Sequence, residues 1–256
     1  MKKDSGTASN RNKFFKNLPS DFILPDDPVE LLLLREYGAV FVAKGGVATP
    51  KAVVFKNCGE VSRFQAGLQK STEIIGDFEM ELQSPAMAAL LKAIGIAESE
   101  NLSIKPRYSD SAGRSYDETV GLWASRVEPA LRHWVIEGKI DQGDAERIEA
   151  LAPYKQVPEV LKLETKGIFF AKDVSKSIIY SVAPPGASQH LSLLAFDVQE
   201  HENPYVQEIL ANAGWFQTVT SDLPHFTFLG VRRGELSQLG LKEIIHERRS
   251  FWIPDM

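Results

Sequence analysis

Two histidine–aspartate pairs are the residues of this chain whose spacing best suits chemistry. In the first pair, His190 precedes Asp197 by seven positions, and Asp197 lies in an otherwise apolar segment, Leu-Leu-Ala-Phe-Asp-Val. In the second pair, Asp222 precedes His225 by three positions. Burying a carboxylate costs several kcal/mol unless a cation or a metal compensates its charge. Two histidines and one aspartate form a ligand set that zinc accepts, with a fourth position left open for water.

The other three histidines are weaker candidates. His133 lies within a helical pattern of apolar residues, and His246 belongs to the charged segment His-Glu-Arg-Arg. Both are interpreted as packed or solvated side chains. His201 follows an expected strand and is a possible but less favoured ligand.

A third segment, Ser111-Ala-Gly-Arg-Ser-Tyr-Asp-Glu-Thr119, precedes both pairs. The three segments, in this order, resemble the zinc D,D-peptidases. That family carries S-G-Y-R-S-Y-x-x-Q, then S-x-H-x-x-G-x-A-x-D, then E-x-W-H. It includes D-alanyl-D-alanine carboxypeptidases and dipeptidases, with a related branch of L-alanyl-D-glutamate endopeptidases. The resemblance covers about residues 84–231.

The resemblance implies a site and a reaction. Three residues would hold one Zn²⁺ ion: His190, Asp197 and His225. Asp222 would be the general base toward the water that zinc activates as nucleophile. Arg114 would stabilise the developing oxyanion or hold the substrate carbonyl. Ser188 would bind the terminal carboxylate of the substrate or support the metal ligands. The implied substrate is a peptidoglycan stem peptide or another D-Ala-D-Ala-terminated peptide.

The departures from the family pattern include Gly113 in place of Tyr, Thr119 in place of Gln, Leu193 in place of Gly, Asp222 in place of Glu and Pro224 in place of Trp. The endopeptidase branch also uses Asp at the general-base position, so that activity stays an alternative. The departures also leave open a catalytically silent module of the same fold that binds peptidoglycan or a partner.

The elements that position these residues indicate an α+β fold, because helical patterns dominate the first part of the chain and β-rich segments the last. The resemblance implies helices packed against a mainly antiparallel sheet that carries the zinc site, as in hedgehog and D,D-peptidase domains. Helices are expected at 60–70, 84–94, 116–137, 141–151 and 203–213. Strands are expected at 38–43, 52–55, 102–105, 167–171, 178–182, 191–198 and 226–231. Three parts follow: a flexible lead-in over 1–21, an N-terminal αβ subdomain over 22–80 and the catalytic domain over 81–256.

Composition limits the other function classes. The chain of 256 residues has 29 basic and 34 acidic side chains and no basic stripe, which argues against nucleic-acid binding. No apolar run is long enough to span a membrane. One cysteine excludes an internal disulfide and a thiolate zinc cluster. A peptidoglycan substrate implies a periplasmic or extracellular location. Because the N-terminus lacks the apolar part of a signal peptide, a leader is expected upstream of or in place of residues 1–20, and a cytoplasmic location stays open.

Overall fold

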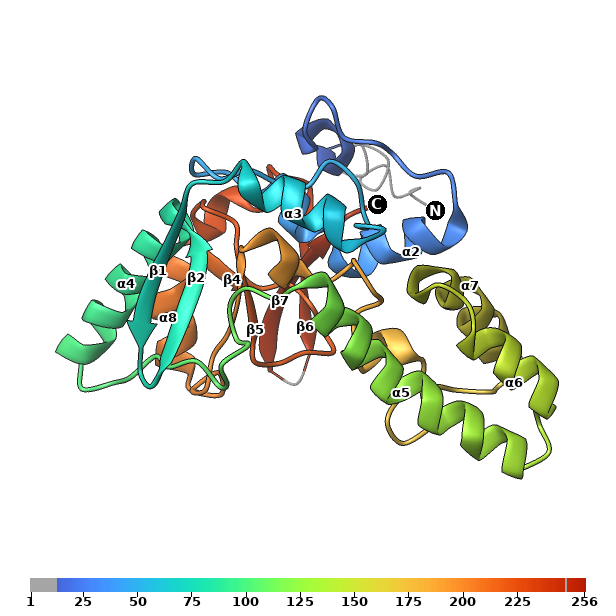
Figure 1. The fold of residues 1–256 in the computed structure, drawn as a ribbon. Helices are drawn as coiled ribbons and strands as arrows, with labels where there is room; N and C mark the ends of the chain where they lie inside the picture. The colour runs from blue at the N-terminus through green and yellow to red at the C-terminus, as the bar shows by residue number, and fades with distance from the viewer. Residues whose placement is uncertain (1–12, 247) are drawn as a thin grey trace, which may run out of the picture. The chain divides into compact units, whose positions relative to one another are not determined.

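The computed structural model describes residues 13–246 and 248–256 (Figure 1). Helices combine with three small antiparallel sheets in this part of the chain, which confirms a mixed helix-and-sheet fold. The chain forms two compact units. The first comprises the chain up to Val53, Phe64–Arg114 and Gln189–Met256, and the second comprises Val54–Arg63 and Ser115–Ser188. The expected boundaries after residues 21 and 80 do not coincide with this division.

The first unit contains both helices and all three sheets. Its helical elements are α2 (Pro28–Tyr37), η1 (Gly38–Val42), α4 (Ser84–Ser99), η3 (Gln189–Ser192), α8 (Pro204–Asn212) and η4 (Arg233–Glu235). Its strands are β1 (Lys70–Ile75), β2 (Phe78–Gln83), β3 (Ala195–Asp197), β4 (Trp215–Gln217), β5 (His225–Phe228), β6 (Leu241–His246) and β7 (Arg249–Pro254). Strand pairs β1–β2 and β6–β7 are separate hairpins, and the third sheet has the order β3-β5-β4.

The three-stranded sheet lies in the core of the first unit. All residues of β3, β4 and β5 are buried, and Phe196, Trp215 and Phe228 pack ring against ring. In the antiparallel register of β3 and β5, Asp197 lies directly opposite His225. The sheet therefore brings together two of the predicted metal ligands.

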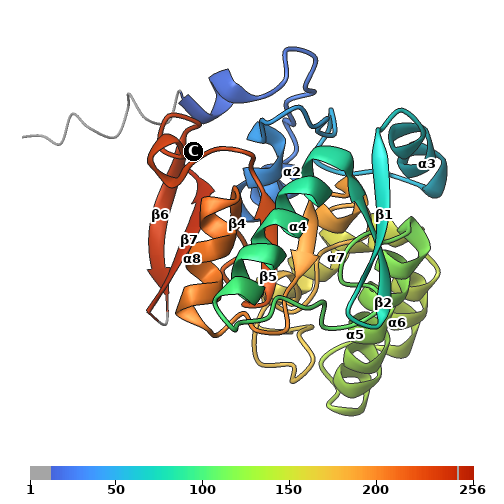
Figure 2. The same cartoon turned by 90° about the vertical axis from the view of Figure 1, so that its left-hand side faces the viewer.

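Helices α4 and α8 lie side by side in this unit (Figures 1 and 2). Met87 and Leu90 of α4 are buried, as are Val206 and Leu210 of α8. Both helices have proline in the first turn, where the missing amide hydrogen costs nothing. Asn203 caps α8, because its side chain accepts from the amide of Tyr205.

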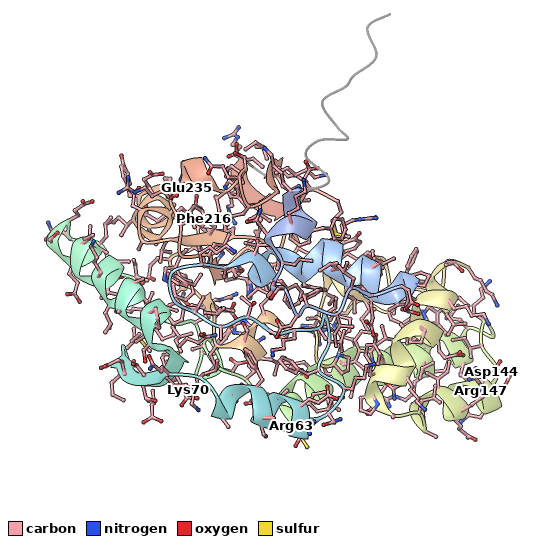
Figure 3. The ribbon with its side chains drawn as sticks, turned by 90° about the horizontal axis from the view of Figure 1, so that it is seen from above. Arg63, Lys70, Asp144, Arg147, Phe216 and Glu235 are labelled. Carbon is pink, nitrogen blue, oxygen red and sulfur yellow. The ribbon has the colours of Figure 1, made fainter. Side chains whose placement is uncertain are left out.

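The second unit is mainly helical. It contains α5 (Tyr116–Ile136), α6 (Gln142–Glu149), α7 (Pro153–Glu164) and η2 (Ile178–Tyr180), and α3 (Cys58–Ala66) runs from it into the first unit along the chain. Ser115 and Glu118 form a capping box at the start of α5, and Asp141 caps α6. Arg147 pairs with Asp144 in α6 and with Glu159 in α7, and Figure 3 shows the first of these pairs. None of the helices among the described residues is long and apolar enough to cross a membrane.

The expected hairpin over 38–43 and 52–55 is wrong. Gly38–Val42 continues from α2 as a 3₁₀ helix, and residues 51–55 form no strand. All five residues of η1 are buried, so tertiary packing rather than strand pairing accommodates this apolar run. A short apolar run has no periodicity that separates a buried strand from a buried helix.

Other expected strands are also wrong or shorter. Residues 102–105 and 167–171 are not strands, 178–182 begins with η2, and 191–198 is divided between η3 and β3. Residues 226–231 form a strand only to Phe228. Five strands and two labelled α-helices were not expected: β1, β2, β4, β6, β7, α2 and α7. The expected helices are confirmed, although α3 ends at Ala66 and α4 continues past Gly95 to Ser99.

The flexible lead-in is only partly testable. Residues 1–12 lie outside the described residues. Residues 13–17 are helical, and Phe14 is fully buried, so the lead-in does not extend to residue 21 as expected. The side chain of Phe14 offsets the entropy cost of ordering this short helix.

Candidate metal centre

Three of the predicted site residues converge in the first unit. His190 Nε2 lies 3.3 Å from Asp197 Oδ1, and His225 Nδ1 lies 3.1 Å from each of these two atoms. The residues come from η3, β3 and β5, respectively. All three are buried, with Asp197 the most exposed at 9%. These side chains form a group that could hold a metal ion.

Hydrogen bonds on the far side of each imidazole direct a lone pair into this group. His190 Nδ1 lies 2.6 Å from the carbonyl oxygen of Ala112, which can only accept, so Nδ1 donates and Nε2 carries the lone pair. His225 Nε2 lies 2.9 Å from Gln189 Oε1, and its donation there leaves the lone pair on Nδ1. Two lone pairs and a carboxylate oxygen then face one another with no hydrogen between them. A cation relieves this repulsion, so the donor set fits a metal.

The charge states support the same interpretation. Burial lowers the pKa of His190, which favours the neutral imidazole that metals bind, although the charge of Asp197 opposes this shift. Burial by itself raises the pKa of Asp197, but whenever His190 or His225 carries a proton on the nitrogen that faces it, charge and hydrogen bonding hold this pKa well below its ordinary value. Asp197 is therefore an anion in this site.

The segment Ser111–Arg114 holds two of the three ligands. The carbonyl of Ser111 accepts from the backbone amide of Asp197 at 2.8 Å, and the next carbonyl, of Ala112, accepts from the first imidazole. Arg114 Nη2 donates to Asp197 Oδ2 at 2.9 Å, and Arg114 Nε lies 3.2 Å from Asp110 Oδ2. Arg114 thus contacts the carboxylate oxygen that faces away from the imidazoles. It orients a ligand here, while its role toward a substrate stays a prediction.

Asp222 lies in the turn before β5, as the sequence predicts. The residue is exposed, and its carbonyl accepts from the amide of His225 at 3.2 Å. Protein atoms around its carboxyl group displace water and raise its pKa, and the negative charge of Asp197 raises it further. A carboxylate with a raised pKa accepts a proton more readily, which is what a general base requires.

Two departures from the resembled family pattern lie against each other. Leu193, in place of the family's glycine, has a φ of 57°, a left-handed conformation that glycine adopts without strain. A Cβ atom on Gly113 would lie 2.8 Å from Leu193 Cδ2. A side chain at position 113 would therefore crowd the end of the Leu193 side chain.

The remaining candidates lie outside this group. His133 is in α5, His246 ends β6, and His201 Nδ1 lies 3.1 Å from the carbonyl oxygen of Val198. Ser188 is the half-buried last residue of the second unit, and its predicted role in substrate binding stays a prediction.

Sequence reasoning missed Gln189 and the carbonyls of Ser111 and Ala112. Backbone carbonyls carry no sequence signal, since every residue has one. Gln189 is adjacent to His190, yet an isolated glutamine does not indicate which side chain it will contact. No family model, curated protein or solved structure matches this chain.

Proposed function

We propose that this protein is a zinc-dependent hydrolase that removes D-alanine from peptides ending in D-Ala-D-Ala. The convergence of His190, Asp197 and His225 carries the proposal. Tetrahedral zinc with bonds of about 2.0–2.1 Å separates its ligand atoms by about 3.3 Å. The three separations of 3.1–3.3 Å between the ligand atoms are close to that value.

Each residue has a chemical task under this proposal. Zinc held by His190, Asp197 and His225 would supply a water of lowered pKa and would polarise the substrate carbonyl. Asp222 accepts a proton during attack and returns it to the leaving amine, which its raised pKa favours. Arg114 keeps Asp197 oriented through the oxygen that does not face the imidazoles. Ser188 would bind the terminal carboxylate of the peptide.

The choice of substrate rests on the sequence resemblance to zinc D,D-peptidases. Peptidoglycan stem peptides end in D-Ala-D-Ala and lie outside the cytoplasmic membrane, so the proposal includes export to the periplasm or the cell exterior. An L-alanyl-D-glutamate endopeptidase is the second candidate, and Asp222 favours it, because that branch carries Asp at this position.

Metal content and product release test the proposal together. Protein purified without added metal is expected to contain zinc or to take up one ion per chain, measured by elemental analysis and titration. It should release D-alanine from a D-Ala-D-Ala-terminated tripeptide. Cleavage of an L-Ala-D-Glu peptide instead would favour the second candidate. His225→Ala should abolish zinc binding, whereas His133→Ala should not. A wild-type protein that binds no zinc would refute the proposal.

A further inference from the structure

Gln189 is buried beside His225 and occupies the variable position between Ser188 and His190 of the resembled motif. Its side chain is within hydrogen-bonding distance of four groups, and the residue is only 3% exposed. Its Nε2 donates to the carbonyl oxygen of Tyr37 at 2.8 Å, and its Oε1 lies 2.9 Å from His225 Nε2. A glutamine amide can in principle be reversed, so the orientation needs a reason.

The carbonyl of Tyr37 supplies that reason. A carbonyl oxygen can only accept, so the NH₂ group of Gln189 must face Tyr37 and its oxygen must face His225. An amide oxygen also only accepts, so His225 Nε2 must carry a hydrogen in the neutral ring. The lone pair of His225 is then on Nδ1, the atom 3.1 Å from both His190 Nε2 and Asp197 Oδ1.

Two buried threonines complete the same directional network. Thr227 Oγ1 donates to Gln189 Oε1, and Thr218 Oγ1 lies 2.7 Å from Thr227 Oγ1. Because Thr227 uses its hydrogen on the amide oxygen, Thr218 donates either to Thr227 or, at 3.4 Å, to the same amide oxygen. Thr218 can then accept from Gln189 Nε2 at 3.3 Å. In either arrangement the amide oxygen of Gln189 faces His225 Nε2, which must therefore be protonated to donate to it.

We propose that Gln189, held by the carbonyl of Tyr37, is a positioning residue that makes His225 present Nδ1 to the metal centre. The inference rests on the proposed function for the identity of the metal, but the tautomer exists without metal. It also gives the N-terminal part of the chain a role at the site, because Tyr37 ends α2. Partners of metal-bound histidines typically contribute about 10–100-fold to metal affinity.

Gln83 provides a matched control within the same unit. It is also a buried glutamine, 2% exposed, and it also joins the N-terminal part of the chain to η3. Its hydrogen bonds run to the backbone of Ala48 and Ser192 rather than to an imidazole. Replacing either glutamine with methionine removes buried hydrogen bonds, but only Gln189→Met removes the acceptor from His225.

The test measures histidine tautomers by ¹⁵N–¹H correlation spectra of the metal-free full chain, then zinc affinity by competition with a chelator. In the wild type we expect His225 as the Nε2–H form. Gln189→Met should lose this preference and weaken zinc binding about 10–100-fold. Gln83→Met should keep the tautomer preference of His225 and the zinc affinity, although the folded state should become less stable. Gln189→Glu should keep the tautomer, since a carboxylate still accepts, although its oxygen opposes the Tyr37 carbonyl.

Three results would overturn the inference: an Nδ1–H form of His225 in the wild type, an unchanged tautomer in Gln189→Met, or an equal change in Gln83→Met. Failure of the proposed function is a different result. A wild-type chain that binds no zinc yet shows the expected tautomers would remove the zinc enzyme and retain the role of Gln189.

Discussion

Asp197 and Asp222 differ in surroundings, and this difference separates their roles. Asp197 is buried between two imidazoles and Arg114, whereas Asp222 is in an exposed turn. Asp222→Asn is expected to retain zinc and to lose about 10²–10⁴-fold in turnover, the usual contribution of proton transfer. Asp197→Asn should lose zinc affinity as well. Elemental analysis and D-alanine release measured on both variants distinguish the roles. Wild-type turnover in Asp222→Asn would contradict its assignment as the base.

Glu164 is a second buried carboxyl group, far from the metal centre in sequence. Burial raises its pKa, although bonds from Ser177 and from the amides of Phe170 and Ile178 oppose the shift. The folded state therefore holds the proton more tightly than the unfolded state. The resulting stability is fully present below the ordinary value of 4.5 and is lost as pH rises through the raised pKa.

This raised pKa predicts that the difference in unfolding free energy between the wild type and Glu164→Gln depends on pH. The glutamine does not titrate, and its oxygen can face both amides. The stability of the wild type relative to this variant should therefore fall as pH rises above 4.5, measured by urea unfolding at a series of pH values. Glu164→Ala should be less stable than either, since two buried amides lose their acceptor at about 1–3 kcal/mol each. If the difference in unfolding free energy between the wild type and Glu164→Gln did not change with pH, the raised pKa of Glu164 would be contradicted.

At the scale of elements, the turn between η3 and β3 and the segment before α5 must fit each other. Gly113→Ala places a Cβ against the buried Leu193 side chain and should cost about 1–3 kcal/mol. In a Leu193→Gly background that contact is absent, so the same substitution should cost much less. A double-mutant cycle of unfolding free energies measures this coupling. Additive costs would show that the two positions do not depend on each other.

Helices with clear apolar spacing could be predicted, whereas most strands could not, including those of the two local hairpins β1–β2 and β6–β7. The helix α5 follows from its apolar spacing, and α8 from Pro204 in its first turn. The segment Gly38–Val42 has strand-forming residues, yet packing makes it a 3₁₀ helix. The ligand triad could be named from a motif resemblance. Its supporting contacts could not, because Gln189 and Tyr37 are 152 positions apart.

At the scale of the molecule, the ligands all belong to one of the two compact units. A metal that binds only the folded state stabilises it by about 4 kcal/mol when the free metal concentration is a thousand times the Kd. A chelator should therefore lower the unfolding temperature of the first unit, and the transition of the helical second unit should change less. Calorimetry with and without chelator measures this effect. The chelator should no longer lower the unfolding temperature in His190→Ala, but it should still do so in His133→Ala. An equal shift of both transitions would contradict the prediction.

The first unit is interrupted after Arg114 and resumes at Gln189. These two residues, on either side of the interruption, contact the candidate metal ligands Asp197 and His225, respectively. The bond between Arg114 and Asp197 spans 83 positions, and the bond between Ala112 and His190 spans 78. Closing such long loops costs entropy before any contact compensates for it. During synthesis, the last ligand, His225, emerges after the whole second unit. Metal binding by all three residues is therefore expected only after His225 has been synthesised and has left the ribosome.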